Sequence, residues 1–537
     1  MTLIQRIVFL MLIAVGLTWP LKAAEFENFE AAIAALPQAD FKSLPALLEG
    51  IAELDDQRVT SLFVHISQGE VYFQKSDKRV FYVLDQADGS ARIIDALNGE
   101  VSQDIEKKQL SKVKTNNRIR SDITQLQAQL NLNHPDPNIR LTAAREMLAD
   151  VSRISDKRLA DRQNKESDGD VADILSLIAA LKQFSKDDAV SQLAALTQLD
   201  STLEPDVRQV LAAASQDAEH YSAEVQTKIK ATLANIESQR NLYSYAENIF
   251  FGLSLGSVLL LAAIGLAITF GVMGVINMAH GEMMMLGAYT TYVIQQWFPN
   301  LIEYSLLIAV PAAFLVSGSV GVIIERSIIQ FLKGRPLETL LATFGVSLIL
   351  QQLVRTVFSP LNRQVIAPEW MSGSWQINPV FSVTFNRLYI ILFSLAVFFM
   401  LLIFLKKSAL GLHVRAVAQN RDMARALSIR SNWVDAATFG LGSGIAGIAG
   451  VVLSQLTNVG PNLGQAYIID SFLVVVFGGV GNLWGTLVSA MTLGVLNKFL
   501  EPLTGPVMAS IIVLVGLVFF IQKRPMGLFP QKGRAVE

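Results

Sequence analysis

No aspartate, glutamate, lysine or arginine occurs between Glu247 and Glu282, and the sequence stays mostly apolar from there almost to its end. Most of the apolar stretches approach the 20 or so residues that a helix needs to cross a bilayer. Because a lipid-facing backbone must satisfy its own hydrogen bonds, these stretches predict helices. The fold class is therefore mainly α, with eight spans if one segment is re-entrant and nine otherwise. The stretches are 248–272, 275–297, 304–324, 338–358, 386–405, 434–456, 467–481, 483–500 and 506–522.

Charge separates this polytopic membrane domain from what precedes it. Residues 1–246 hold 27 Lys and Arg against 35 Asp and Glu, whereas residues 247–537 hold 17 against 11. A soluble, mildly acidic domain at 25–246 and a membrane domain at 247–537 follow from this division. At the start, Arg6, an apolar run from Ile7 to Trp19 and a small residue at Ala24 predict a secretory signal peptide at 1–24. An uncleaved anchor helix is the alternative, and either one exports the soluble domain.

The exported segment reads as α-rich with a small β portion. Helical patterns at 26–54 and 121–239 flank residues 59–100, where short β-prone runs from Val71, Val80 and Ala91 indicate a small sheet. The octapeptides at 137–144 and 205–212 resemble each other, each with a proline that can start a helix. Residues 157–170 are charged and predict a loop. Nothing in this segment indicates catalysis, so a docking or regulatory role is expected.

Basic residues in short loops set the orientation of a membrane protein. The loops 325–338 and 406–433 and the tail from Lys523 are rich in Lys and Arg. All three are expected to be cytoplasmic in a multi-pass protein of a bacterial inner membrane, with the 25–246 domain periplasmic. The chain has no cysteine, which excludes disulfides and thiolate metal sites, and no metal site is expected.

Polar residues inside the apolar stretches indicate a path through the membrane, because ionisable groups at that depth are costly. One group lies at 277–282 and a second recurs at helical spacing along 338–358. Orienting a small polar solute is one interpretation, and hydrogen bonding between helices is the alternative. The predicted pathway residues are Asn277, His280, Glu282, Thr343, Ser347 and Gln351.

The loop from Gly411 to Ile429 contains a second pattern of interest. Asn420 is placed to cap a short helix covering 421–427, and such a helix needs a surface to pack on. In a transporter driven by a separate ATPase, that surface would belong to the ATPase. A basic loop that only touches anionic lipid headgroups is the alternative. The residues predicted to couple this loop to an ATPase are Arg415, Asn420, Arg421, Met423, Arg425 and Leu427.

These stretches resemble the branched-chain amino-acid type of ABC-importer permease over about 245–530. The resemblance rests on 275–282, 287–289, 341–347, 411–429 and 477–485. It implies a second homologous permease subunit, two cytoplasmic ATPase subunits and a periplasmic solute-binding protein, in a complex held in membrane lipid. The signal peptide and long exported segment look like the urea-transporter subunit of this family.

The function predicted on this basis is translocation of a small neutral substrate, urea, in an ATP-driven importer. A permease for branched-chain amino acids or another small amide is the alternative, and a passive channel or membrane-anchored sensor is a third hypothesis. No Gly-x-x-x-x-Gly-Lys-[Ser/Thr] motif occurs, so this chain is expected to be no enzyme, with ATP used only by partner subunits. It is expected to carry no cofactor and to bind no nucleic acid.

Overall fold

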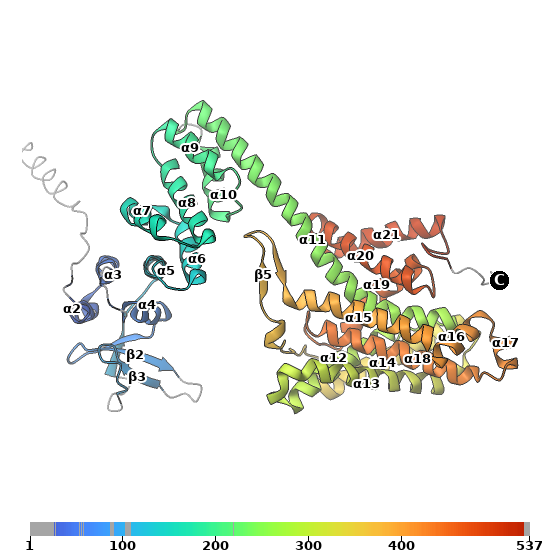
Figure 1. Ribbon diagram of the computed structural model, residues 1–537. Helices are drawn as coiled ribbons and strands as arrows, with labels where there is room; N and C mark the ends of the chain where they lie inside the picture. Colours follow the sequence, from blue (N-terminus) through green and yellow to red (C-terminus); the bar gives the residue numbers. More distant parts are fainter. Residues whose placement is uncertain are drawn as a thin grey trace, which may run out of the picture. The chain divides into compact units, whose positions relative to one another are not determined.

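The computed structural model describes residues 26, 28–52, 54, 56, 58–85, 91–102, 109–217 and 220–530. The predicted signal peptide lies outside these residues. The chain divides into an N-terminal unit, Met1–Glu237, and a C-terminal unit, Ser238–Glu537. Helix α11 (Ala223–Met273) begins in the first unit and continues into the second (Figure 1).

The first part of the N-terminal unit packs helices against a small antiparallel sheet with strand order β3-β2-β1-β4. The sheet was predicted within residues 59–100, but it begins at Val71, because residues 58–68 form a helix, and it extends to Lys112 in β4. One face of that helix is buried. The apolar residues on this face are three or four positions apart, as helical spacing requires: Val59, Leu62, Phe63 and Ile66. The elements are α2 (Phe29–Ala35), η1 (Leu36–Gln38), α3 (Leu44–Ala52), α4 (Arg58–Gln68), β1 (Val71–Gln74), β2 (Val80–Asp85), β3 (Ala91–Asp95) and β4 (Leu110–Lys112).

The second part of this unit is a series of helices around a separate apolar core. Both predicted repeats are helices, α6 and α10, and each begins at a proline that has no amide proton to leave unpaired. The elements are α5 (Asn117–Asn131), α6 (Pro137–Leu148), η3 (Val151–Arg153), α7 (Asp156–Lys165), α8 (Gly169–Phe184), α9 (Ala189–Leu199) and α10 (Pro205–Gln216), followed by the start of α11.

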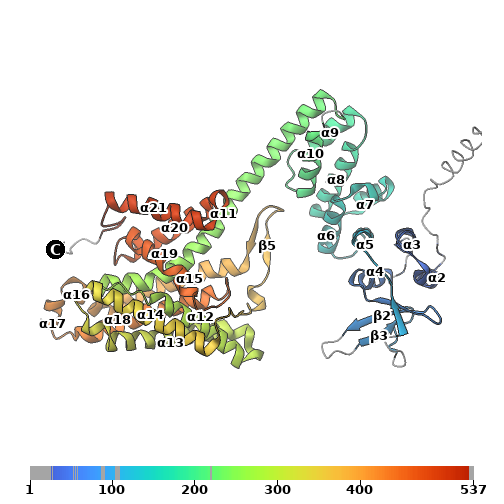
Figure 2. The ribbon, with the colours of Figure 1, turned by 180° about the vertical axis from the view of Figure 1, so that it is seen from behind.

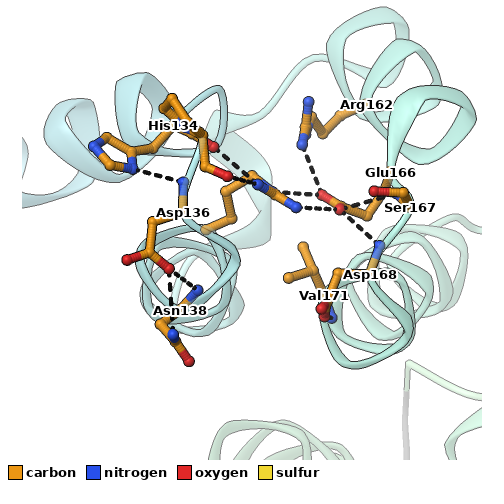
Figure 3. Close-up of polar contacts among 10 residues, drawn as sticks. His134, Asp136, Asn138, Arg162, Glu166, Ser167, Asp168 and Val171 are labelled. Carbon is orange, nitrogen blue, oxygen red and sulfur yellow. Dashed lines mark hydrogen bonds and ion pairs between the residues drawn. The ribbon is translucent and has the colours of Figure 1, made fainter.

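The prediction of a loop at 157–170 is wrong, because most of these residues belong to helix α7. Ser155 caps this helix, and Leu159 is its buried apolar residue. Glu166 lies just beyond the end of α7, and its side chain has no exposed surface. Its carboxylate accepts two hydrogen bonds from the guanidinium of Arg140, one from Nε at 3.0 Å and one from Nη2 at 2.7 Å. Arg162 bonds the same carboxylate at 2.7 Å (Figure 3). These charge-assisted bonds join α6 to the α7–α8 turn.

Each of the nine apolar stretches contains a helix in the described part of the C-terminal unit. Among the described residues, seven helices are long and apolar enough to cross a membrane, and α12 and the shorter α19 are not among these seven. The elements after α11 are α12 (His280–Trp297), η4 (Pro299–Tyr304), α13 (Ser305–Ser327), η5 (Ile329–Phe331), α14 (Pro336–Phe358), η6 (Glu369–Met371), β5 (Ser374–Gln376), β6 (Ser382–Thr384), α15 (Phe385–Lys407), α16 (Ala409–Gln419), α17 (Arg421–Ala426), α18 (Ser431–Leu453), α19 (Leu463–Gly478), α20 (Leu483–Thr504) and α21 (Pro506–Lys523).

Helix α18 is the most buried of these helices, and α12 and α13 lie along it in both views (Figures 1 and 2). Glycines allow this close packing. A Cβ added at Gly450 would lie 1.9 Å from the carbonyl oxygen of Met284 on α12, and one added at Gly287 would lie 2.0 Å from that of Gly447. Small residues of this kind let helix backbones meet where lipid supplies no hydrophobic drive.

The three basic segments gather at one end of the C-terminal unit. Lys333 and Arg421, from different loops, both contact Asp435 at the start of α18. The tail bonds to the α19–α20 turn through Phe529, and the end of α11 packs against α16. This arrangement agrees with the prediction that the three segments share one side of the membrane. We call this region the basic end; it comprises residues 325–338, 406–433 and 523–530.

Candidate functional site

The helix break between α11 and α12 creates the first part of the site. Helix α11 ends at Met273, and Gly274 follows with φ +69°, a conformation that glycine adopts without strain. Asn277 lies in this non-helical segment, 1% exposed, and its Oδ1 accepts the amide of Ala279 at 3.0 Å. Irregular backbone at membrane depth is tolerated where protein buries it. The break therefore places polar backbone and an amide side chain inside the bundle.

Glu282, on the first turn of α12, is the centre of a buried polar cluster. Its Oε1 accepts hydrogen bonds from Ser347 Oγ at 2.8 Å and from Gln351 Nε2 at 2.7 Å, both on α14. Thr343, one turn earlier on α14, accepts the amide of Met278 at 3.1 Å. The structure thus brings together four of the six predicted pathway residues and joins α12 to α14 through polar contacts.

The polar residues of α14 form a stripe. Thr339, Thr343, Ser347 and Gln351 are four residues apart and all are buried. Residues four apart share a helix face, so the stripe follows one side of α14. The other side is apolar and exposed at Leu337, Leu341, Phe344, Leu348 and Leu353. Helix α14 therefore turns its polar side inward and its apolar side outward.

Three polar atoms of this region have no hydrogen-bond partner in the described part of the chain: Glu282 Oε2, Asn277 Nδ2 and the hydroxyl of Tyr289. Buried polar groups normally find partners, since leaving one unmade costs roughly 1–3 kcal/mol. Tyr289 lies two turns after Glu282 on α12 and so on a similar face. The set offers an acceptor, a donor and a group that does both, as a small polar solute requires.

His280 does not join this cluster. Its ring Nε2 lies 2.9 Å from the carbonyl oxygen of Ala262 on α11, and a Cβ at Gly265 would lie 2.8 Å from its Cε1. Two residues apart on a helix point to different faces, so His280 and Glu282 diverge. The histidine therefore contacts α11, whereas the glutamate contacts α14.

Comparison with known proteins identifies the class to which this architecture belongs. The model of the branched-chain amino acid transport system / permease component family matches residues 248–521. The chain belongs to this permease family. The matched range contains all six residues predicted for the pathway.

Individual relatives agree with this assignment. The high-affinity branched-chain amino acid transport system permease protein BraD of Pseudomonas aeruginosa is 29% identical over 298 residues, 53% of this chain and 96% of the relative. The LivH permease protein of Salmonella typhimurium is 29% identical over 301 residues, 54% and 97%. The ribose import permease protein RbsC of Escherichia coli is 27% identical over 264 residues, 47% and 78%. No solved structure matches the chain significantly.

The permease has a short helix in the loop where one was predicted. Asn420 precedes α17, and its Oδ1 accepts the amide of Met423 at 3.0 Å, which confirms the predicted cap. Met423 and Leu427 are 60% and 74% exposed, so the apolar surface of this loop is largely uncovered in the isolated chain. Arg415 is also exposed and bonds the carbonyl oxygen of Leu405.

The two arginines of α17 bind within the chain. Arg421 donates to Asp435 Oδ2 at 2.6 Å and to Oδ1 at 3.0 Å. Arg425 donates through Nε to Ser431 Oγ at 2.9 Å and lies 3.7 Å from Asp422. Arg421 is therefore held by its own permease, whereas Arg425 remains half-exposed.

Sequence reasoning missed two carboxylates that complete the basic end. Glu325 and Asp435 have no exposed side-chain surface and both contact Lys333. An acid inside the apolar stretch 434–456 is a signal that was present in the sequence. Tyr289 was not among the predicted residues, although its spacing from Glu282 places it on a similar helix face.

Proposed function

We propose that this chain is the translocation subunit of an ATP-driven importer for a small polar solute. The observation that carries the proposal is the half-satisfied Glu282 carboxylate, buried between α12 and α14 inside an apolar bundle. An unmade hydrogen bond at a buried oxygen costs free energy, so a ligand that donates to Oε2 would recover it. Ser347 and Gln351 hold Oε1, which leaves Oε2 as the acceptor for a passing solute.

Branched-chain amino acids are the cargo that the relatives' names favour. The ammonium group of such a solute would donate to Glu282 Oε2, and its carboxylate would accept from Asn277 Nδ2. Each contact replaces one that the solute loses when it leaves water, which is what passage through a buried site requires.

Urea is the second candidate, and two observations favour it. The relatives align over 96–97% of their own length but only 53–54% of this chain, so they account for little of the N-terminal unit on which the urea resemblance rests. The unpartnered atoms also suit a neutral amide, whose N–H groups donate to Glu282 Oε2 and whose carbonyl accepts from Asn277 Nδ2.

The partners follow from the same proposal. Two ATPase subunits would contact the loop at the basic end through Met423 and Leu427, the exposed apolar residues of the α17 segment. A solute-binding protein would deliver cargo on the opposite side of a bacterial inner membrane, where the N-terminal unit would also lie. A second, homologous permease subunit would complete the membrane part, with lipid around it.

Uptake of labelled leucine and labelled urea, at low external concentration, in cells with and without this chain tests the proposal. The neighbouring transport genes remain intact. Uptake of either solute that needs both the chain and ATP supports the importer and names its cargo. Uptake that persists after ATP depletion would instead indicate a channel, and the absence of any chain-dependent uptake would refute transport of both solutes.

A further inference from the structure

Two carboxylates with no exposed side-chain surface lie side by side at the basic end. Glu325 lies in the last turn of α13, and Asp435 lies in the second turn of α18. A buried charge is costly unless it is paired. Lys333 Nζ pairs with both, at 2.8 Å from Asp435 Oδ2 and 3.3 Å from Glu325 Oε1. The lysine therefore holds the ends of two membrane helices together.

Arg421 connects α17 to the same place. Its two terminal nitrogens bond the two oxygens of Asp435, at 2.6 and 3.0 Å. A bidentate arginine–carboxylate pair fixes orientation as well as distance. Because α17 has only six residues and a helix of that length is not stable alone, this fork sets how the α17 segment sits on α18.

Helix α18 leads from this charge pair to the polar cluster. Its Gly447 and Gly450 pack against the backbone of α12, and a Cβ at Gly450 would overlap the carbonyl of Met284. Met284 is two residues from Glu282. Packed helices transmit displacement because their interiors are close-packed and stiff. A shift of α18 along its axis would therefore move the helix that carries Glu282.

We propose that Arg421, Asp435, Lys333 and Glu325 form a latch that transmits movement of α17 into α18 and from there to α12. The proposal rests on the proposed ATP-driven function. Arg421 and Asp435 act as positioning residues in it, since neither contacts the polar cluster. The exposed Met423 and Leu427 would receive the ATPase, and the latch would carry its motion inward.

The latch has a second acceptor built into it. Neither oxygen of Glu325 has a hydrogen-bond partner within the described ranges, although Lys333 Nζ lies 3.3 Å from Oε1 and Arg326 Nε lies 3.8 Å from Oε2. A cation that leaves Asp435 thus has a neighbouring carboxylate that accepts no hydrogen bond in this arrangement. Coupling between distant sites needs an element with two discrete arrangements, and this pair of acids supplies them.

The absence of cysteine from the sequence allows a direct test. We would replace Ser347 by cysteine, as the one thiol of this chain, in the assembled transporter. Its labelling rate by a small methanethiosulfonate would be measured with and without ATP and vanadate, in the absence of cargo. With the latch intact we expect nucleotide to change this rate about tenfold, a typical allosteric coupling. Asp435→Asn should abolish the change.

Asp435→Glu keeps a carboxylate for both Arg421 and Lys333 and should retain most of the nucleotide response. The control is the double variant Arg335→Gln and Glu338→Gln, which removes an exposed ion pair of the same end and should leave the response unchanged. Co-purification of the ATPase subunits checks assembly. If Asp435→Asn fails to assemble, Arg421→Lys keeps the charge but loses the fork, and it should lower the response.

Several results would overturn the latch. They are no nucleotide response in the parent, a response in Asp435→Asn within about twofold of the parent, no response in an assembled Asp435→Glu variant, and an unchanged response in Arg421→Lys. The proposed function fails separately, through the uptake assay. A parent chain whose labelling rate changes with nucleotide, but which transports neither leucine nor urea, would refute the proposed cargoes and support the latch.

Discussion

Acidification should weaken the N-terminal unit by a calculable amount through Glu166. The guanidinium of Arg140, followed by the amide of Asp168 and the side chain of Arg162, lowers the pKa of this glutamate from 4.5 to about 2. A lowered folded-state pKa means that the stabilisation is complete above the unfolded value and is lost as pH falls from about 4.5 through 2. The shift corresponds to about 3 kcal/mol of unfolding free energy.

Glu166→Gln isolates this contribution, because other carboxylates titrate equally in both proteins. At neutral pH the variant should be less stable by about 3–5 kcal/mol, since the Arg140 side chain is only 9% exposed and loses its charged partner. Between pH 5 and pH 2.5 the difference should shrink by about 2.4 kcal/mol, most of the full shift. The uncharged side chain has no proton to gain, so only the parent loses stability over this range.

The measurement is urea unfolding of a fragment of residues 25–246, followed by circular dichroism across this pH range. The fragment holds all three hydrophobic clusters of the described part of the N-terminal unit. The control is Glu100→Gln, at an exposed position in the same unit. A stability difference between parent and Glu166→Gln that stays constant from pH 5 to pH 2.5 would refute the pairing argument.

Three further changes test the C-terminal unit. Glu282→Gln should reduce uptake of the transported solute at least about tenfold with unchanged membrane insertion, because the acceptor at Oε2 is replaced or lost; uptake near the parent level would remove Glu282 from the pathway. Gly450→Val should lower the melting temperature strongly, since its side chain meets a backbone carbonyl, whereas Gly516→Val, with open space around it, should not. Asn420→Ala should cost about 1 kcal/mol of local α17 stability, visible as faster hydrogen exchange in 421–427, and unchanged exchange there would contradict the cap.

Local patterns were sufficient for much of the fold. Each long apolar stretch is a helix, because a membrane-embedded backbone has few other options. The cap at Asn420 needed only its own neighbours and was predicted correctly. The small sheet was predicted from β-prone runs, but its extent was not, because residues 58–68 combine β-branched residues with helical spacing.

Long-range pairs explain what the sequence did not reveal. Residues 157–170 were predicted as a charged loop, although α7 covers most of them, because the bonds that secure the end of this helix reach Arg140, 26 positions before Glu166. Arg421 was expected to face a partner protein, yet its acceptor is Asp435, which also binds a lysine 102 positions away. The grouping of Glu282 with Ser347 and Gln351 likewise depends on how α14 packs, which residue spacing alone does not determine.

The stripe on α14 has a consequence for the surroundings of the protein. One boundary of the polar cluster is a single helix whose opposite side presents Leu341, Phe344 and Leu348 outward. Whatever covers these residues, acyl chains or a neighbouring subunit, is separated from Glu282 by the thickness of that helix alone. Lateral pressure from the membrane would therefore act on the solute site directly, and the lipid composition would become a determinant of transport.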